Sequence, residues 1–380
     1  MAVTNAKKYK EIKVQLKKTP LAQAHKKLGA QMVNFGGWYM PVFYSNLMEE
    51  HQTTREKAGL FDICHMGEIK ITGKKSQELV QQLITRNIDG MPVGKIYLSV
   101  ICSEKGGIID DLTIYKIAED EYMLVTNAGT KDKDLQQVLK VKKQLGLTDS
   151  EVKVVDISNK IAKFDLQGPN SQSILKKICS ADLDSLKYYS FVKGNILDVK
   201  AIISRSGYTG ELGYEIYFNS KEAVRIWNKL LSVGKNLGLK PIGLGARDTL
   251  RLECGMNLYG HEISEEFHPL QSRYGWVVSF DKEFVGKKAL EKIKTKGWEK
   301  QLVGFEIVDR GIARNCYQIF KNSQRIGWVT SGTYSPTFKK GIGMAYIDKK
   351  YDKLGTKLKI KIRDNLVEAK IIKLPFYKRS

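Results

Sequence analysis

The sequence predicts an α+β fold made of two split β-α-β units of ferredoxin-like type, followed by an all-β module. Three observations support this prediction. Helical and strand patterns alternate with closely spaced strand pairs, and this order occurs twice between residues 67 and 233. The paired strands are close enough for hairpins, which argues against a doubly wound parallel sheet. After about residue 278 the chain changes to short strands punctuated by glycine.

The N-terminal part is predicted to begin with two helices. Thr19 can cap the free amides of a helix whose first position suits Pro20, and Gly29 ends that helix. A second helix is predicted from residue 49 to residue 58, because Gly59 then closes it.

The remaining elements follow in chain order. The first unit has strands at 67–72, 96–102, 108–117, 122–127 and 151–156, with helices at 75–85 and 131–145. The second unit has strands at 160–166, 196–204 and 212–218, with helices at 170–179 and 221–233. The last module has a helix at 286–295 and strands at 301–308, 325–330, 342–347, 356–362 and 367–373.

The charge is strongly positive, with 63 Lys and Arg against 41 Asp and Glu, a formal net charge of +22. Such a charge favours acidic partners. The lysines are dispersed, however, and no basic block alternates with aromatic residues, so no nucleic-acid-binding module is predicted. A general enrichment in lysine explains the same pattern. Residues 1–18 hold six lysines and one acid, and we interpret them as an exposed basic arm rather than a targeting peptide.

The cysteines and histidines argue against a metal site. Five cysteines without a CxxC pair do not form a zinc site or a disulfide framework, and they favour a reducing compartment. The five histidines lack the spacing of metal ligands. No apolar run of membrane-spanning length occurs, so no membrane partner is predicted.

The segment GGIIDDLTIY (106–115) places two adjacent carboxylates on a strand after a glycine turn. Because side chains alternate between the faces of a strand, Asp110 and Asp111 point in opposite directions. Asp110 shares its face with apolar residues, whereas Asp111 shares its face with Thr113 and Tyr115. Asp111 is therefore the carboxylate predicted to enter a polar pocket. The alternative is a solvated pair at a hairpin.

The segment SGYTGELGYEIY (206–217) places Glu215 inside an otherwise apolar strand. A half-buried carboxylate is costly unless it is paired. Its two oxygens can accept parallel hydrogen bonds from a planar, guanidine-like edge, as in an arginine or a pterin ring. Glu215 is thus either a ligand-binding residue or half of a structural Arg–Glu pair.

The segment GLGARDTLRLECGMNLYG (243–260) has two glycines before a short helix that opens at residues 246–248. Arg247 lies near the helix N-terminus, where anions are favoured. Arg251, one turn later, is either a second such group or part of a core ion pair. No Rossmann unit surrounds the glycines, which argues against a dinucleotide site.

Two further motifs carry less information. Cys64 and His65 are neighbours on a strand, where adjacent side chains point apart, so packing is favoured over a thiol–imidazole pair. The segment TSGTYSPT (330–337) indicates a tight β-turn.

Taken in order, these motifs closely resemble the aminomethyltransferase family, the folate-dependent T-proteins of the glycine cleavage system. The resembling segments are 19–42, 59–69, 106–112 (GGIIDDL), 167–170 (QGPN), 206–217, 241–263, 284–290 and 331–337. One departure is Cys64, where the family usually has serine before His-Met. The basic arm before Thr19 is also additional.

The resemblance implies a three-domain cloverleaf around a central folate channel. The folate-binding domain would comprise 19–66 and 157–277, with a ferredoxin-like domain inserted at 67–156 and a jelly-roll or barrel-like domain at 278–380. By their positions in the family's motifs, Asp111 is the catalytic acid, Glu215 holds the pterin edge and Arg247 contacts folate. The expected pocket lining is Met66, Tyr97, Asn127 and Tyr189. Arg314 is expected to meet the lipoyl arm.

The implied reaction moves a one-carbon unit from the S-aminomethyl-dihydrolipoyl arm of the carrier H-protein to tetrahydrofolate. Its products are 5,10-methylenetetrahydrofolate, ammonia and the dihydrolipoyl H-protein. Tetrahydrofolate is a co-substrate and no metal takes part. We expect a monomer whose partner is the lipoylated H-protein, in the cytoplasm of a bacterium or the mitochondrial matrix of a eukaryote.

Relatives of similar fold offer alternative functions. A folate-dependent demethylase of a small methylated compound would use the same pocket without a carrier protein. Sarcosine and dimethylglycine dehydrogenases add a flavin domain, for which the chain has no glycine fingerprint. The folate-binding protein of iron–sulfur maintenance carries a KGCYxGQE-like segment, which is absent here.

Overall fold

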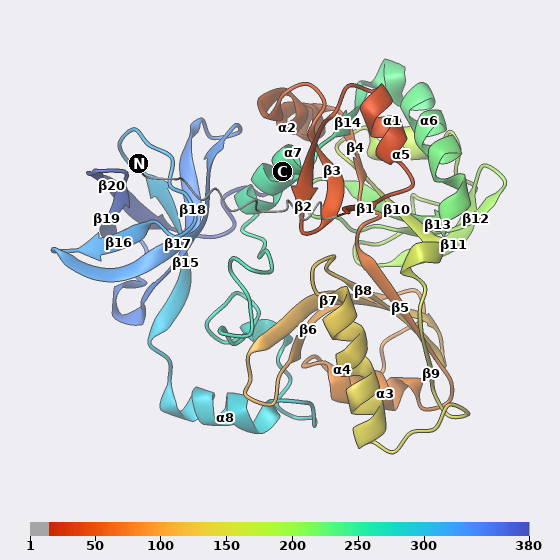
Figure 1. Cartoon of the computed structure of the whole chain (residues 1–380), viewed down its shortest axis with the longest axis horizontal. Helices are drawn as coiled ribbons and strands as arrows, with labels where there is room; N and C mark the ends of the chain where they lie inside the picture. The colour runs from red at the N-terminus through yellow and green to blue at the C-terminus, as the bar shows by residue number, and fades with distance from the viewer. Residues whose placement is uncertain (1–14, 380) are drawn as a thin grey trace, which may run out of the picture.

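Three β-rich bodies surround the centre of the molecule in the computed structural model, which describes residues 15–379 (Figure 1). The predicted basic arm falls outside the described residues, except for its end, where Lys17–Lys18 form strand β1. Within the described part of the chain, no helix combines the length and the apolar character needed to cross a bilayer.

The N-terminal segment forms a small three-stranded sheet that the sequence patterns did not predict. Its order is β1-β3-β2, with β2 at Gln31–Phe35 and β3 at Trp38–Phe43. Helix α1 (Ala22–Lys27) begins two residues later than Pro20, so the predicted start is wrong. The Thr19 hydroxyl instead donates to the Asp62 carboxylate over 2.6 Å.

The six-stranded sheet has the order β14-β4-β10-β13-β12-β11. Its strands are β4 (Ala58–Asp62), β10 (Ile161–Gln167), β11 (Phe191–Ile196), β12 (Val199–Ser204), β13 (Gly213–Asn219) and β14 (Leu239–Ile242). Its helices are α2 (Leu47–Glu56), α5 (Ser171–Leu175), α6 (Ala223–Gly234) and α7 (Leu244–Glu253). The strand predicted over 196–204 is confirmed as β12, but its predicted start is too early and β11 was missed, because the chain turns at Leu197, whose φ is 56°, and forms the hairpin β11–β12.

The five-stranded sheet lies between β4 and β10 in sequence and has the order β9-β5-β8-β7-β6. Its strands are β5 (Gly67–Thr72), β6 (Ile96–Cys102), β7 (Ile108–Ala118), β8 (Glu121–Thr126) and β9 (Lys153–Asp156). Its helices are α3 (Ser76–Leu83) and α4 (Lys131–Gln144). Both sheets therefore follow the ferredoxin-like order with an extra hairpin strand at one edge, and β4 is inserted into the larger sheet. The predicted repetition of this unit is confirmed.

The C-terminal part is a closed barrel with the order β15-β18-β17-β16-β19-β20. Its strands are β15 (Lys300–Ile307), β16 (Gln318–Lys321), β17 (Gln324–Ser335), β18 (Lys340–Asp348), β19 (Lys357–Ile362) and β20 (Asn365–Ile372). Helix α8 (Lys287–Lys296) precedes it. Closure pairs β15 with β20 and leaves no free sheet edge.

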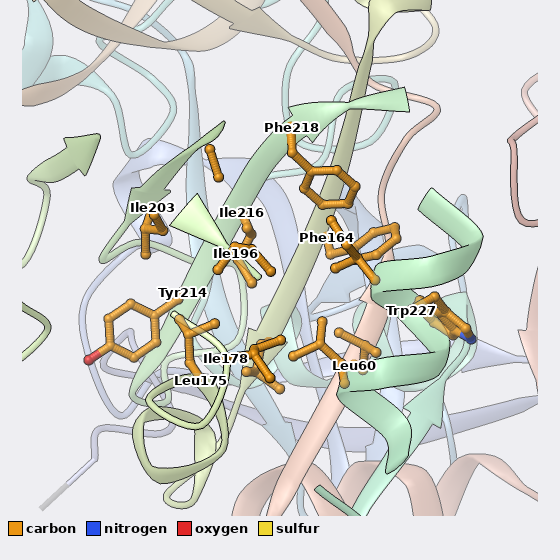
Figure 2. Packing of buried hydrophobic residues seen from close by; sticks show 14 of the residues in the cluster. Leu60, Phe164, Leu175, Ile178, Ile196, Ile203, Tyr214, Ile216, Phe218 and Trp227 are labelled. Carbon is orange, nitrogen blue, oxygen red and sulfur yellow. The ribbon is translucent and has the colours of Figure 1, made fainter. Parts of the chain in front are cut away.

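Alternation along the strands of the six-stranded sheet separates its core from its polar side. Figure 2 shows Phe164 of β10 between Phe218 of β13 and Trp227 of α6, with ring centroids 5.0 and 5.3 Å from that of Phe164. Because successive side chains point to opposite faces, Lys163 and Glu215 lie on the face away from this core. That face turns toward the five-stranded sheet.

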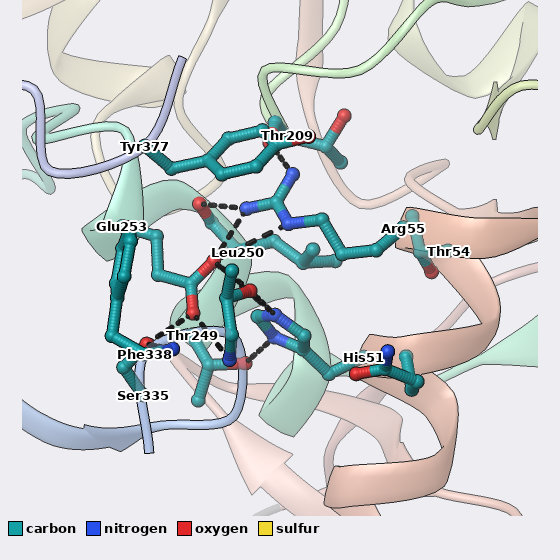
Figure 3. A network of polar contacts seen from close by, with 12 residues as sticks. His51, Thr54, Arg55, Thr209, Thr249, Leu250, Glu253, Ser335, Phe338 and Tyr377 are labelled. Atoms are coloured by element: carbon teal, nitrogen blue, oxygen red, sulfur yellow. Dashed lines mark hydrogen bonds and ion pairs between the residues drawn. The ribbon is translucent and has the colours of Figure 1, made fainter. Parts of the chain in front are cut away.

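A buried carboxylate joins the barrel to the rest of the molecule (Figure 3). Glu253 of α7 pairs with Arg55 of α2 over 2.8 Å and with His51 over 3.2 Å. It also accepts a hydrogen bond of 2.5 Å from the Ser335 hydroxyl at the end of β17. Tyr377, beyond the barrel, places its ring 3.8 Å from the Arg55 guanidinium carbon.

Candidate functional site

A cavity of about 540 Å³ lies between the two ferredoxin-like sheets. Its lining comes from β7, the end of β8, β10, β13, the start of α7 and the irregular segments 254–261 and 273–276. A volume of this size is typical of a small-molecule site. The polar groups of the cavity fall into two sets, one centred on Asp111 and the other on Glu215.

Asp111 enters the cavity from β7, and Asp110 does not line it. The strand follows a tight turn in which a side chain on Gly107 would clash, because its Cβ would lie 1.9 Å from the Glu265 carbonyl oxygen. Asn127 donates from its side-chain nitrogen to Asp111 Oδ1 and to Asp110 Oδ1, each over 2.8 Å. The Tyr274 hydroxyl donates to Asp111 Oδ2 over 2.6 Å.

The Asp111 carboxylate accepts hydrogen bonds only from neutral donors, Asn127 and Tyr274, and its pKa lies above the usual value. Burial raises the pKa of Asp111, while the hydrogen bonds from Tyr274 and Asn127 act in the opposite direction. Behind it, burial and the charge of Asp111 raise the pKa of Asp110. Burial and the charge of Asp110 likewise raise the pKa of Asp134 on α4. The three carboxyl groups therefore hold protons more tightly than exposed ones do.

Glu215 has a cationic partner instead. Its Oε1 lies 2.9 Å from Lys163 Nζ on the neighbouring strand β10, and its Oε2 accepts a hydrogen bond of 2.5 Å from the Ser206 hydroxyl. Burial alone would raise the pKa of Glu215, but the charge of Lys163 and the Ser206 hydrogen bond hold this pKa below its usual value. The structural partner is thus a lysine rather than the arginine considered from the sequence.

Arg247 lies in the first turn of α7 and faces the same set of groups. Its Nη1 is 3.2 Å from Asp165 Oδ2, and its guanidinium carbon is 4.8 Å from the centre of the Tyr208 ring. Asp165 is directly opposite Glu215 in the β10–β13 register. Arg251 belongs to a core ion pair, with its Nη1 2.9 Å from Glu262, which settles the alternative left open by the sequence.

Of the five other residues expected at the site, three line the cavity and two do not. Met66, Asn127 and Tyr189 line the cavity. Tyr97 is not among the lining residues; the Arg86 guanidinium lies 4.0 Å from the centre of its ring. Arg314 is exposed and lies outside the cavity, with its Nη1 donating to the Gly332 carbonyl over 3.2 Å.

Several lining residues were missed in the sequence. Lys163 could have been recognised, because it alternates with apolar residues in IAKFDLQ and so marks a polar strand face, shared with Asp165, which does not itself line the cavity. Tyr274 and Arg273 carry none, since they lie in an irregular segment. Arg273 lines the cavity, and its Nη1 is buried without a hydrogen-bond partner among the described residues.

Cys64 and His65 do not form a reactive pair. Cys64 is buried and its Sγ contacts the Lys163 backbone, and burial raises the pKa of its thiol. His65 lines the cavity, and burial lowers the pKa of its ring to about 4. Over residues 15–379, no group of three or more His, Cys, Asp or Glu side chains is arranged to hold a metal ion.

The arrangement suits a ligand with a flat polar ring. Glu215, Lys163 and Arg247 together present an acceptor and donors along one wall, and Asp111 stands apart as a carboxyl group with a raised pKa. Pairs of carboxylates whose surroundings push their pKa values in opposite directions are typical of sites that bind with one group and move protons with the other. No nucleophilic cysteine or serine assembly accompanies them within the described part of the chain.

Comparisons with known proteins agree along almost the whole chain. Residues 21–282 match the family described as GCVT N-terminal domain, and residues 300–378 match the glycine cleavage T-protein C-terminal barrel domain. An aminomethyltransferase from Halothermothrix orenii is 46% identical over 364 residues, covering 95% of this chain and 100% of that protein. One from Desulforamulus reducens is 44% identical over 367 residues, covering 96% and 99%. The crystal structure of glycine cleavage system aminomethyltransferase T from Bartonella henselae superimposes with a TM-score of 0.89 at 32% identity, covering 96% of this chain and 99% of that one.

Proposed function

The chain belongs to the glycine cleavage T-protein family of aminomethyltransferases, and on that premise we propose how its central cavity carries out the reaction. The protein is an enzyme, an aminomethyltransferase of the glycine cleavage system. Its family acts with tetrahydrofolate and works with the H-protein. The proposal concerns the residues that bind tetrahydrofolate and move protons.

The observation that carries the proposal is that one cavity holds two carboxylates in opposite surroundings. Glu215 is kept ionised by Lys163, so it can accept hydrogen bonds from the donor edge of a pterin. Arg247 lies on the same wall and is proposed to contact the folate ring system. The Arg273 guanidinium, which has no ion-pair partner among the described residues, suits the carboxylates of the folate tail. The residues present therefore fit tetrahydrofolate.

Bound tetrahydrofolate supplies the nucleophilic nitrogens that accept the one-carbon unit. Asp111 is the proposed catalytic residue, because it is the cavity carboxylate whose pKa is raised by burial and whose oxygens face the cavity beside Tyr274 and Asn127. Its free lone pairs can accept a proton from a ligand nitrogen and return it to the departing ammonia. Met66, Asn127 and Tyr189 are proposed to enclose the ligand and exclude water.

The finer assignments are further proposals. Arg314 is exposed on the barrel, a position open to the lipoyl arm of the H-protein. Tyr97 would contribute to the pocket indirectly, because its ring packs against Arg86, and Arg86 packs against the cavity residue Trp276. We propose a monomer that needs no metal, located in the bacterial cytoplasm, since the similar curated proteins are bacterial. The six-stranded sheet with the small N-terminal sheet, the five-stranded sheet and the barrel support the proposed domain bounds 19–66 with 157–277, 67–156 and 278–380.

The test is a reconstituted assay with aminomethylated, lipoylated H-protein and tetrahydrofolate. Ammonia and methylenetetrahydrofolate should appear in equal amounts, and omitting tetrahydrofolate should abolish the methylene product. Replacing the H-protein by sarcosine or dimethylglycine tests the demethylase alternative. Folate-dependent turnover of a small methylated amine at a rate equal to that with H-protein would overturn the carrier-dependent reaction.

A further inference from the structure

An irregular segment between α7 and α8 closes one side of the cavity next to β7. Its chain is fixed to that strand, because the Ile108 amide donates to the Phe267 carbonyl over 2.9 Å. Tyr274 lies in this segment, just before a 3-10 turn at Gly275–Val277. Its ring packs in a buried apolar cluster that includes Val100 and Ile108. The segment therefore holds the Tyr274 ring firmly against the strand that carries Asp111.

The Tyr274 hydroxyl has one partner among the described residues, Asp111 Oδ2, at 2.6 Å. Asn127 occupies the other oxygen, Oδ1, over 2.8 Å. Tyr274 is 8% exposed, and the part of it that is not packed lines the cavity beside Asp111. Each oxygen of the carboxylate thus has a protein donor and keeps further lone pairs directed to the cavity.

We propose that Tyr274 is a positioning residue for Asp111, whose hydroxyl holds the carboxylate in its ionised form and aims it at the reacting nitrogen of the bound folate. This inference rests on the function proposed above. Asn127 alone fixes only one end of the carboxylate, because its amide group donates to Asp111 Oδ1 and to Asp110 and leaves Asp111 Oδ2 to Tyr274. The Tyr274 hydroxyl donates its single hydrogen to Asp111 Oδ2.

The groups that face Asp111 explain why a neutral donor matters there. Asp110 on the same strand and Asp134 on α4 are acids, and neither favours the Asp111 carboxylate. Tyr189 and Tyr208 face it across the cavity, and burial keeps both phenols protonated. The cavity cations Lys163 and Arg247 are paired with Glu215 and Asp165, and Arg273, which also lines the cavity, forms no ion pair with Asp111 among the described residues. Ionisation of Asp111 therefore depends on Tyr274 and Asn127.

Tyr274 remains a donor throughout the working range of pH. Burial and the neighbouring Asp111 charge raise the pKa of Tyr274 well above its usual value, so its hydroxyl keeps its proton. A donor to the charged form lowers the pKa of a carboxyl group, and removing that donor raises it. The loss of the hydroxyl should thus be visible in the pH dependence of turnover.

The test compares Tyr274→Phe with the unmodified enzyme in the assay with H-protein. The acidic limb of the kcat profile should move up by about one pH unit, which corresponds to about tenfold in the ionisation constant. Turnover should fall by about tenfold below this limb and recover as the pH is raised, with little change in the KM for tetrahydrofolate. A structural role alone would lower turnover equally at every pH.

Two further variants make the result specific. On an Asp111→Asn background, Tyr274→Phe should change turnover by less than about twofold, because the hydroxyl then has no titrating partner to act on. Tyr122→Phe is the matched control: its hydroxyl donates to Gln77 on the other side of the same sheet, and its profile should not move. An unshifted profile for Tyr274→Phe, or equal losses in both backgrounds, overturns the proposal. Absence of turnover in the unmodified enzyme instead contradicts the proposed function.

Discussion

Each of the two ferredoxin-like sheets places one carboxylate in the same cavity, and the two surroundings shift the pKa values of these carboxylates in opposite directions. The six-stranded sheet surrounds Glu215 with Lys163 and Arg247, which hold its pKa below the usual value. The five-stranded sheet gives Asp111 only neutral donors and two acidic neighbours, and burial raises its pKa. The same backbone plan therefore produces a fixed charge for binding in one sheet and a proton-exchanging group in the other.

The largest effect is expected from removing the group that exchanges protons. Asp111→Asn keeps the volume but cannot accept a proton, so kcat should fall by about 10²–10⁴-fold. Tetrahydrofolate should still bind with similar affinity, measured by calorimetry. Asp110→Asn is the control, because Asp110 lies outside the cavity and its loss should cost far less turnover. Full activity in Asp111→Asn would show that the carboxylate is structural.

The fixed charge should matter for binding rather than for turnover of the bound complex. Glu215→Gln replaces one acceptor by a donor, and a hydrogen bond to a charged group contributes about 1.5–3 kcal/mol. The dissociation constant for tetrahydrofolate should therefore rise by more than about tenfold, as measured by titration. An unchanged constant would contradict the assignment of Glu215 to the pterin edge.

A single substitution should also remove the difference in pKa shift between Glu215 and Asp111. Lys163→Met deletes the cation beside Glu215, so burial should raise the pKa of that carboxyl group. A raised pKa means that Glu215 becomes protonated as the pH falls toward it. Folate affinity in the variant should then weaken as the pH falls, over a range in which the affinity of the unmodified protein stays flat. A thermal melt at each pH separates this effect from unfolding, and a flat affinity in the variant would contradict the role of Lys163.

The smallest effect concerns charges at the surface. Salt screens exposed charges strongly, whereas it screens buried ion pairs much less. The chain carries a formal net charge of +22, so association with an acidic H-protein should be steered by charge. The association rate, measured by stopped flow, should fall when salt rises from about 0.1 to 1 M, as the screening length shortens from about 10 to 3 Å. If the rate is independent of salt, the positive charge does not guide the encounter.

The parts of the fold that depend on local periodicity could be predicted from the sequence. Both ferredoxin-like units and the C-terminal β module follow from strand and helix patterns, and the face that Asp111 shares follows from alternation along one strand. The small sheet β1-β3-β2 and the hairpin at Leu197 were missed, because short strands without clear alternation give weak patterns. Helix α1 also begins two residues later than predicted, and the Thr19 hydroxyl binds both Asp62 and the Leu21 amide.

The partners of the site residues could not be predicted in the same way. Lys163 meets Glu215 only through the register of β10 against β13, which depends on how the strands pair. Tyr274 meets Asp111 across 163 positions of sequence, through a segment with no repeating pattern. Local sequence therefore identifies cavity side chains that lie on regular strands, such as Asp111, whereas tertiary structure adds Tyr274 and Arg273 and decides which groups are protonated.

The contacts of Glu253 have a consequence for motion. This single buried carboxylate holds Arg55, His51 and Ser335, and so connects α2, α7 and the barrel. Swinging the barrel outward would remove the Ser335 hydrogen bond to this carboxylate but leave its pairs with Arg55 and His51, and a hydrogen bond to a charged group contributes about 1.5–3 kcal/mol. The barrel and α7 should therefore move as one rigid body rather than about a hinge. Opening of the cavity to its substrates is then left to the shorter loops at its rim.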